Sequence, residues 1–316
     1  MYYEPIRGVM IRMIAVRCAL AAVLCSLTAN AATPSLGQGD REITVRVGTQ
    51  TRTCLIHLPP AHGGARLLPL LITLHASGQT GDAMAKMTGF NAMADKHGWI
   101  TAFPDGVIGK KRAWNSLFGK VPGGQGVTAD DVDHVAFIRS LIDTLRNSYH
   151  TDPNRVFVCG HSSGAYMAYR VAIDLADRIA AAGVVNGLLG IRLLDGKPCI
   201  PDIPMPVAPV SLIHICGAKD NLVKFGGGQT PKVIVKSVPD CIQYFVKANG
   251  CAAAGKETKD AEHGVVRTLY SGGKAGTEVE LVIVENCNHN WPFPPTGLSA
   301  SQALWEFFSK HPKAAR

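Results

Sequence analysis

The stretch VFVCGHSSGAYMAYRVA, residues Val156–Ala172, places a short serine turn between an apolar run and a run of small residues. The apolar run is typical of a buried strand, and the residues after Gly164 predict a helix. Gly160 and Gly164 lie two residues before and two residues after Ser162. Side chains at those positions would collide with a serine held on a sharp turn, so the glycines favour a strained strand-to-helix turn that exposes the hydroxyl. The alternative is an ordinary tight turn that happens to contain serine.

The rest of the chain alternates between predicted strands and predicted helices. After a hairpin at residues 41–60, buried strands are indicated at 67–75, 99–105, 152–160, 181–187, 209–217 and 278–286. Helices are predicted at 81–98, 164–176 and 239–250. Two more are predicted to begin at capping residues, one at Asp130 or Asp131 and the other at Ser299 or Ser301. This order predicts an α/β fold in one domain, with a mostly parallel sheet covered by helices on both faces. The segment from Gly187 to Pro209 is the one plausible insertion or lid.

The N-terminus differs from the rest of the chain. Arg7, Arg12 and Arg17 precede an uncharged apolar run, Cys18–Leu27, and an A-x-A pattern at Ala29–Ala31. This order predicts a signal peptide at residues 1–31, cleaved after Ala31 or Ala32, followed by one catalytic domain at 32–316. We therefore expect a secreted, extracellular or periplasmic protein; a buried core helix is the alternative reading.

The composition is that of an ordinary globular protein, with 47% hydrophobic residues, 18% charged residues and a net charge of +8. Lys and Arg are scattered and form no basic stripe on a predicted helix, so no nucleic-acid partner is expected. No stretch beyond the leader is apolar and long enough to cross a membrane, so we expect no stable membrane insertion once the leader is removed. No C-x-x-C pair is present, and we expect no metal and no cofactor.

Seven of the nine cysteines lie outside the leader. Export permits disulfides, and the odd number leaves at least one free thiol. Cys159 and Cys216 lie in strand-like runs and are expected to be buried thiols. The better disulfide candidates, whose pairing the sequence does not give, are Cys199, Cys241, Cys251 and Cys287.

A serine hydroxyl needs a base to act as a nucleophile, and the base needs a carboxylate to orient it. When the serine lies on such a turn, the acid and then the histidine follow it along the chain. Asp220 follows one predicted strand and His289 follows another, so both are expected at the same sheet edge as Ser162. We predict Ser162, Asp220 and His289 as a catalytic triad.

Other side chains compete for these roles. Asp202 and Asp240 are rival acids, but no strand immediately precedes either of them. His263 is a rival base that precedes a strand, whereas His214 lies within a strand and is expected in the core.

Two backbone N–H groups are expected to form the oxyanion hole. One belongs to Ser163, and the other to Ser77, with Ala76 as the near alternative, in the loop after an early strand. Trp114, Asn115 and Trp291 are expected to bind substrate, with the two indoles forming an apolar wall. Core packing is the alternative for the tryptophans.

Several stretches resemble a known family. They are LLPLLITLHASGQTG at 67–81, RAWNSLF at 112–118, DDVDHVAFIRSLIDTL at 130–145, YHTDPNRVFVCGHSSGAYMAYRVA at 149–172, IHICGAKDNLV at 213–223 and NHNWP at 288–292. Together they are similar to the secreted poly(3-hydroxybutyrate) depolymerase and feruloyl esterase family of α/β-hydrolases. The resemblance implies an α/β-hydrolase domain with Ser162, Asp220 and His289 as its triad. The chain departs from relatives at His75-Ala76-Ser77, where they commonly have His-Gly-Cys or His-Gly-Ser.

The residues and the resemblance together predict an exported serine carboxylesterase that forms an acyl-enzyme. The expected substrates are hydroxyalkanoate oligomers. A feruloyl or acetylxylan-type esterase acting on aryl or acyl esters of plant polysaccharide is the alternative. A serine peptidase and a catalytically inactive binding protein are further alternatives.

Overall fold

The structure is a computed structural model that describes residues 39–63, 66–119 and 132–314. Ten strands of this described part form one sheet. Their order across the sheet is β1 (Asp40–Val47), β2 (Gln50–His57), β4 (Ile100–Pro104), β3 (Leu68–Leu74), β7 (Thr151–His161), β8 (Ala181–Val185), β11 (Ser211–Gly217), β16 (Val279–Val284), β15 (Val265–Tyr270) and β14 (Lys256–Asp260). The strands from β4 to β16 run parallel, and those outside them pair antiparallel. Every residue of β3, β4, β8 and β11 is buried, as expected for strands covered on both faces.

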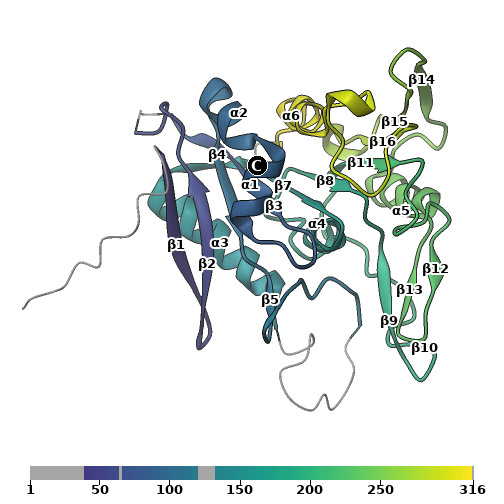
Figure 1. Cartoon of the computed structure of the whole chain (residues 1–316), viewed down its shortest axis with the longest axis horizontal. Coiled ribbons are helices and arrows are strands. Elements are labelled where there is room, and N and C mark those ends of the chain that lie inside the picture. The colour runs from purple at the N-terminus through teal and green to yellow at the C-terminus, as the bar shows by residue number, and fades with distance from the viewer. Residues whose placement is uncertain (1–38, 64–65, 120–131, 315–316) are drawn as a thin grey trace, which may run out of the picture. The chain divides into compact units, whose positions relative to one another are not determined.

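Six helices cover the two faces of this sheet within the described residues (Figure 1). Apolar side chains of α1 (Gly81–Thr88), α2 (Phe90–His97) and α6 (Ala300–Lys310) share one core cluster. Those of α3 (His134–Tyr149), α4 (Ser163–Asp174) and α5 (Val238–Asn249) share the other. The predicted α/β architecture, with helices on both faces of a mostly parallel sheet, is therefore confirmed.

Two helix boundaries differ from those expected. The predicted helix at 81–98 is two helices with a break at Gly89. The side chain of Asp133 caps α3 by accepting a hydrogen bond from the N–H of Ala136, whereas Asp130 and Asp131 lie outside the described residues. At α6, Ser299 is the cap.

The predicted insertion between Gly187 and Pro209 forms half of a second, small sheet. This sheet has the order β10 (Lys197–Pro198), β9 (Gly190–Leu194), β13 (Val233–Val235) and β12 (Gly228–Gln229). Its strands come from the segments that follow β8 and β11, and Figure 1 shows it extending away from the main sheet below α5. The remaining short elements are β5 (Val107–Ile108), β6 (Lys111–Arg112), and 3-10 turns at Lys274–Gly276 and Pro294–Thr296.

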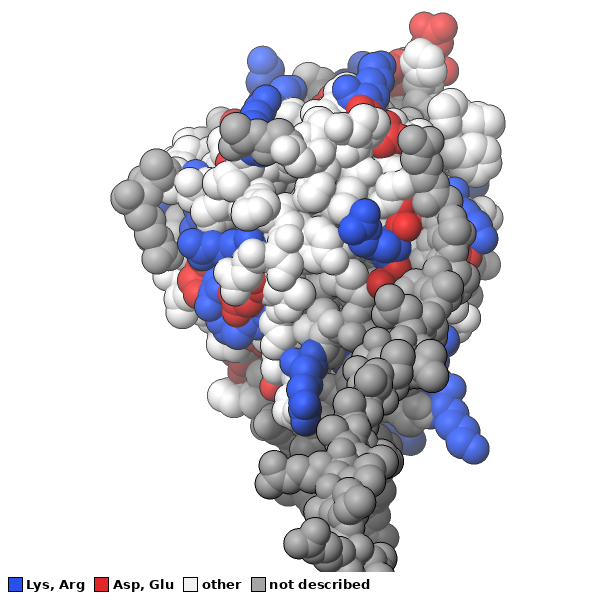
Figure 2. Space-filling view, turned by 90° about the vertical axis from the view of Figure 1, so that its left-hand side faces the viewer, with Lys and Arg blue, Asp and Glu red and all other residues white. Residues whose placement is uncertain are grey.

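The predicted signal peptide, with its cleavage points at Ala31 and Ala32, lies outside the described residues. Across the ranges that are described, no helix has the length and apolar character needed to span a membrane. On the face shown in Figure 2, basic and acidic side chains are interspersed and do not gather into a patch of one sign.

All seven cysteines within the described ranges are free thiols. Cys159 and Cys216 are buried, as expected, and burial raises the pKa of each to about 12. Of the disulfide candidates, Cys241 and Cys287 are also buried in the core, whereas Cys199 and Cys251 are partly exposed. None of these four candidates forms a disulfide in the described part of the structure, and Cys241 lies within α5 with its thiol packed in the core.

Candidate active site

Ser162 lies at the junction of β7 and α4 in a strained backbone conformation. Its φ is 52° and its ψ is −120°, a region that residues other than glycine rarely adopt. The N–H of Ser162 donates to the carbonyl of Val185 in the neighbouring strand, and its own carbonyl accepts from Ala165 in the helix. Because the serine side chain makes no capping hydrogen bond to the helix, its hydroxyl is available to other groups.

The glycines around Ser162 are required by close backbone contacts. A Cβ at Gly160 would lie 2.3 Å from the carbonyl oxygen of Gly164, and a Cβ at Gly164 would lie 2.1 Å from that of Leu74 in β3. The reason predicted for both glycines was a collision with the serine side chain. The structure shows instead that they allow the helix to approach β7 and β3.

The three predicted triad residues lie in one chain of hydrogen bonds. Ser162 Oγ is 2.9 Å from His289 Nε2, and His289 Nδ1 is 2.7 Å from Asp220 Oδ2. They follow β7, β16 and β11 respectively, so strand ends bring together residues that are 127 and 69 positions apart in sequence. With Nδ1–H donating to the carboxylate, Nε2 is left to accept the serine proton.

The carboxylate of Asp220 is buried and fixed at both oxygens. Its side chain is 3% exposed. While Oδ2 faces His289, Oδ1 accepts hydrogen bonds from the backbone N–H groups of Leu222 and Val223, both 2.9 Å long. Asp220 therefore caps a turn and orients a histidine at the same time.

The rival residues lie in other environments. Asp202 accepts from the N–H of its neighbour, and Asp240 lies in the first turn of α5. His263 is exposed and paired with Asp260, and His214 is fully buried in β11. Among the described residues, none of these rivals hydrogen-bonds to Ser162 or His289.

The two predicted oxyanion donors belong to different segments. Ser163 begins α4, so its N–H lies at the positive end of the helix dipole. Ser77 is exposed in the loop after β3. Within the described residues, neither backbone N–H donates a hydrogen bond to a protein acceptor.

Trp114 lies beneath the Ser77 loop and supports it. Its indole Nε1–H donates to the carbonyl of His75 over 2.8 Å, and its ring packs at 5.0 Å from the His75 ring. Trp291 is likewise buried, with Nε1–H donating to Ser301 and the ring nearly perpendicular to that of Phe90. Each tryptophan is 5% exposed. The alternative of core packing describes where both indoles lie, and an aromatic wall for substrate stays a prediction.

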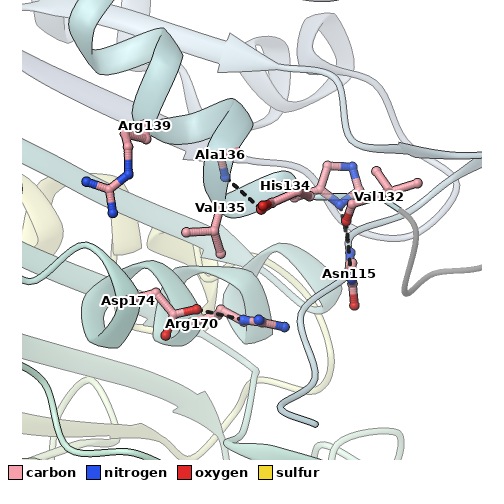
Figure 3. A pocket seen from close by; sticks show the side chains of 9 residues that line it. Asn115, Val132, His134, Val135, Ala136, Arg139, Arg170 and Asp174 are labelled. Atoms are coloured by element: carbon pink, nitrogen blue, oxygen red, sulfur yellow. Dashed lines mark hydrogen bonds and ion pairs between the residues drawn. The ribbon is translucent and has the colours of Figure 1, made fainter. Parts of the chain in front are cut away.

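Asn115 lies apart from the triad. It lines a cavity of about 290 Å³ between α3 and α4, together with His134, Arg139, Arg170 and others (Figure 3). Its backbone N–H donates to His134 Nδ1, and none of the three triad residues lines this cavity.

Sequence reasoning missed two residues beside the triad. The ring of His161 lies 5.3 Å from that of His289, and burial, followed by the charge of His289, lowers the pKa of His161 to about 4. Asn186 follows β8 and hydrogen-bonds to the loop that carries His289. The dipeptide Asn186-Gly187 was a turn signal that could have drawn attention to it.

The chain is similar in sequence to one protein family and to several curated proteins. The model of the family described as esterase PHB depolymerase matches residues 53–192. The chain is 29% identical over 250 residues to feruloyl esterase B of Piromyces equi, covering 75% of this chain and 42% of that one. It is 28% identical over 249 residues to poly(3-hydroxyalkanoate) depolymerase C of Paucimonas lemoignei, covering 74% and 57%. The chain thus spans about half the length of these two relatives.

A likeness to solved structures extends over most of the chain. The acetyl xylan esterase from Aspergillus awamori superposes with a TM-score of 0.61 at 14% identity, covering 85% of this chain and 99% of that one. At this identity the match shows a common α/β-hydrolase fold. The sequence matches show that the chain is similar to the esterase PHB depolymerase family, whose model matches 140 of its 316 residues, and the proteins that it matches are carboxylic ester hydrolases.

Proposed function

We propose that this protein is a serine carboxylesterase that hydrolyses hydroxyalkanoate oligomer esters through an acyl-enzyme. The observation that carries the proposal is the chain of hydrogen bonds, 2.9 and 2.7 Å long, from Ser162 through His289 to Asp220. A serine on a strained turn, a histidine within reach of its proton and a buried carboxylate behind the histidine are the parts that acyl transfer requires.

Each group has one role in the proposed reaction. Ser162 Oγ attacks the ester carbonyl while His289 Nε2 takes its proton, and the resulting oxyanion accepts hydrogen bonds from the N–H groups of Ser163 and Ser77. The tetrahedral intermediate collapses, and His289 returns the proton to the departing alcohol. Water, deprotonated by His289, then attacks the acyl-serine; the bond to Ser162 Oγ breaks, His289 returns the proton to that oxygen, and the acid is released. Asp220 holds the imidazole in the required tautomer.

The side chains in the triad loops support an apolar, aliphatic substrate. Leu222 and Phe225 follow Asp220 within five positions, Phe293 follows His289 by four, and all three are exposed. Exposed apolar groups in these loops are suited to contact an acyl chain. The burial of Trp114 and Trp291 removes the main support for an aryl site. The match to feruloyl esterase B keeps aryl esters as the alternative substrate class.

The nucleophile is tested with a matched pair of adjacent serines. Ser162→Ala should abolish ester hydrolysis and labelling by a fluorophosphonate. Ser163→Ala removes only a hydroxyl whose oxygen is buried without a partner among the described residues, and it keeps the backbone N–H. It should retain most of the activity. Hydrolysis retained in Ser162→Ala, or a wild-type protein that the probe does not label, would show that the assignment is wrong.

The substrate class is tested by parallel assays on soluble 3-hydroxybutyrate oligomers and on methyl ferulate, with Ser162→Ala as the blank. The proposal expects faster turnover of the oligomers and a higher KM for them in Leu222→Ser. Faster turnover of the ferulate would assign the protein to aryl esters. Cleavage of a peptide amide at a comparable rate would favour a peptidase.

Export is part of the proposal and rests on the leader at residues 1–31. Arg7, Arg12 and Arg17, an apolar run and an A-x-A pattern support it. Expression of the full chain in a bacterial host should yield a periplasmic or extracellular product that begins after Ala31 or Ala32. An intact N-terminus on a protein retained in the cytoplasm would contradict export.

A further inference from the structure

Asn186 occupies a position that the proposed mechanism does not use. It follows the last residue of β8, the strand that lies between β7 and β11 in the sheet. Its side chain and backbone are buried, with 1% of the residue exposed. Its φ of 53° lies in the left-handed region, which asparagine tolerates better than most residues. Burial and an unusual backbone conformation together show that the surroundings hold this residue firmly.

Both ends of the Asn186 carboxamide are occupied. Oδ1 accepts a hydrogen bond from the N–H of Gly217, at the end of β11, over 3.1 Å. Nδ2 donates to the carbonyl of Asn290 over 2.9 Å and faces that of Asn288 at 3.5 Å. These two carbonyls flank His289 in sequence. The side chain therefore ties the strand that leads to Asp220 to the loop that carries His289.

The sheet order explains why this loop needs a contact there. His289 follows β16, and Ser162 follows β7, three strand positions away. Neighbouring strands lie 4.7–4.9 Å apart, so the loop must cross about 14 Å over the ends of β11 and β8 to bring the imidazole to the serine. At β11 the loop lies directly on Gly217, where an added Cβ would be 2.4 Å from the carbonyl oxygen of Cys287. At β8 the contact is made by Asn186.

We propose that Asn186 is a positioning residue that holds the His289 loop across β8, at the distance at which His289 reaches both Ser162 and Asp220. This inference rests on the proposed triad. A structural role alone would lower the stability of the protein and leave turnover by the folded molecules unchanged. A positioning role would lower kcat in a protein that remains folded, because small displacements of a catalytic base cost large factors in rate.

Asn186→Asp is the most direct variant. Aspartate has the same shape and also tolerates the left-handed region. It can still accept from Gly217, but its second oxygen, when ionised, repels the carbonyls of Asn288 and Asn290. We expect kcat at pH 8 to fall roughly 100-fold, with KM changed less than about threefold.

Asn249→Asp is the matched control. Asn249 is also fully buried, and both ends of its carboxamide are hydrogen-bonded to backbone groups. Its Oδ1 accepts from the N–H of Val210 over 3.0 Å, and its Nδ2 donates to the carbonyl of Val210 over 2.8 Å. It lies at the end of α5 and has no contact with the triad among the described residues. This control should lose thermal stability while its kcat stays within about twofold of wild type.

The pH dependence gives a second readout. A protonated aspartic acid donates a hydrogen bond where the amide did, so the ratio of Asn186→Asp to wild-type kcat should rise as the pH is lowered from 9 to 7. The same ratio for Asn249→Asp should stay flat. If Asn186→Asp fails to fold, Asn186→Gly keeps the left-handed backbone without strain and removes the carboxamide, and it should show the same loss of kcat.

Labelling by a fluorophosphonate separates the two proposals. If wild type is labelled at Ser162 and Asn186→Asp is labelled at an equal rate with kcat within threefold, only the positioning role is wrong. A loss of kcat in Asn249→Asp as large as that in Asn186→Asp would also overturn it. If wild type is not labelled at Ser162, the triad is wrong and the positioning role falls with it.

Discussion

Replacing Asp220 by asparagine changes one atom of the triad and should reverse the direction of its hydrogen bonds. Two backbone N–H groups, of Leu222 and Val223, donate to Oδ1, both over 2.9 Å. The amide oxygen of the variant should take that position, because an NH₂ group there would point at two N–H donors and both would lose their acceptor. The NH₂ group is then left to face His289 Nδ1, 2.7 Å away.

The tautomer of His289 follows from that orientation. An NH₂ group donates, so Nδ1 must accept, and the neutral ring then carries its proton on Nε2. That nitrogen is the atom 2.9 Å from Ser162 Oγ, and once protonated it cannot take the serine proton. A wrong tautomer of this kind lowers kcat about 10⁴-fold, which corresponds to roughly 5.5 kcal/mol of transition-state stabilisation.

The assay is the initial rate of ester hydrolysis at saturating substrate and pH 8, with Asp202→Asn as the control. We expect Asp220→Asn to lose about four orders of magnitude in kcat, while KM and the thermal midpoint change little because the shapes match. Asp202→Asn should behave as wild type. A loss smaller than tenfold in Asp220→Asn, or an equal loss in Asp202→Asn, would refute the argument from the fixed amide oxygen.

Two further predictions concern stability. Gly164→Ala should lower the free energy of unfolding by about 3 kcal/mol or more in urea titrations, because its Cβ would lie 2.1 Å from the carbonyl oxygen of Leu74. Gly226→Ala, where an added Cβ meets nothing within 4 Å, should cost little, and equal losses would contradict the close-contact explanation. Burial lowers the pKa of His214 to about 3. As the pH falls below about 6.5, the unfolded chain therefore binds a proton at this histidine that the folded chain does not bind. This difference should lower the free energy of unfolding by about 2 kcal/mol between pH 8 and pH 5. Replacing the hydrogen-bonded pair together, by Tyr169→Phe with His214→Leu, should reduce the measured pH dependence by that amount, and an unchanged dependence would show that His214 is not held neutral.

The parts of the fold that the sequence predicted are those with strong local patterns. Mostly apolar runs such as Leu68–Leu74 and Ser211–Gly217 are typical of strands covered on both faces. Glycines at 160 and 164 leave few alternatives to a tight strand-to-helix turn. The small sheet was not predicted, because β12 and β13 have only two and three residues and no alternating pattern. β14 is exposed at all five positions and gives no apolar signal.

The environment of the site was less predictable than the positions of its polar residues. Proximity in sequence suggested that Trp114 and Trp291 face the substrate, yet partners far along the chain decide where they lie. Trp291 packs on Phe90 in α2 and donates to Ser301 in α6, contacts that no local pattern records. A polar residue at the end of a parallel strand can lie only at one edge of the sheet, whereas a large aromatic residue in a loop can turn toward either the core or the solvent.

The two strained residues at the centre of the site are held by the same packing. Ser162 and Asn186 follow adjacent strands, and each has a positive φ that costs of order 1–3 kcal/mol. The N–H of Ser162 donates to the end of β8, and that of Asn186 donates to Ile215 in β11, so each strained residue is bonded to the next strand. The strands that supply these acceptors are buried along their whole length. If the backbone of either residue relaxed to a negative φ, its hydrogen bond to the adjacent strand would break. The buried centre of the sheet therefore does more than stabilise the fold, because it keeps the nucleophile turn and the contact of the histidine loop in register with each other.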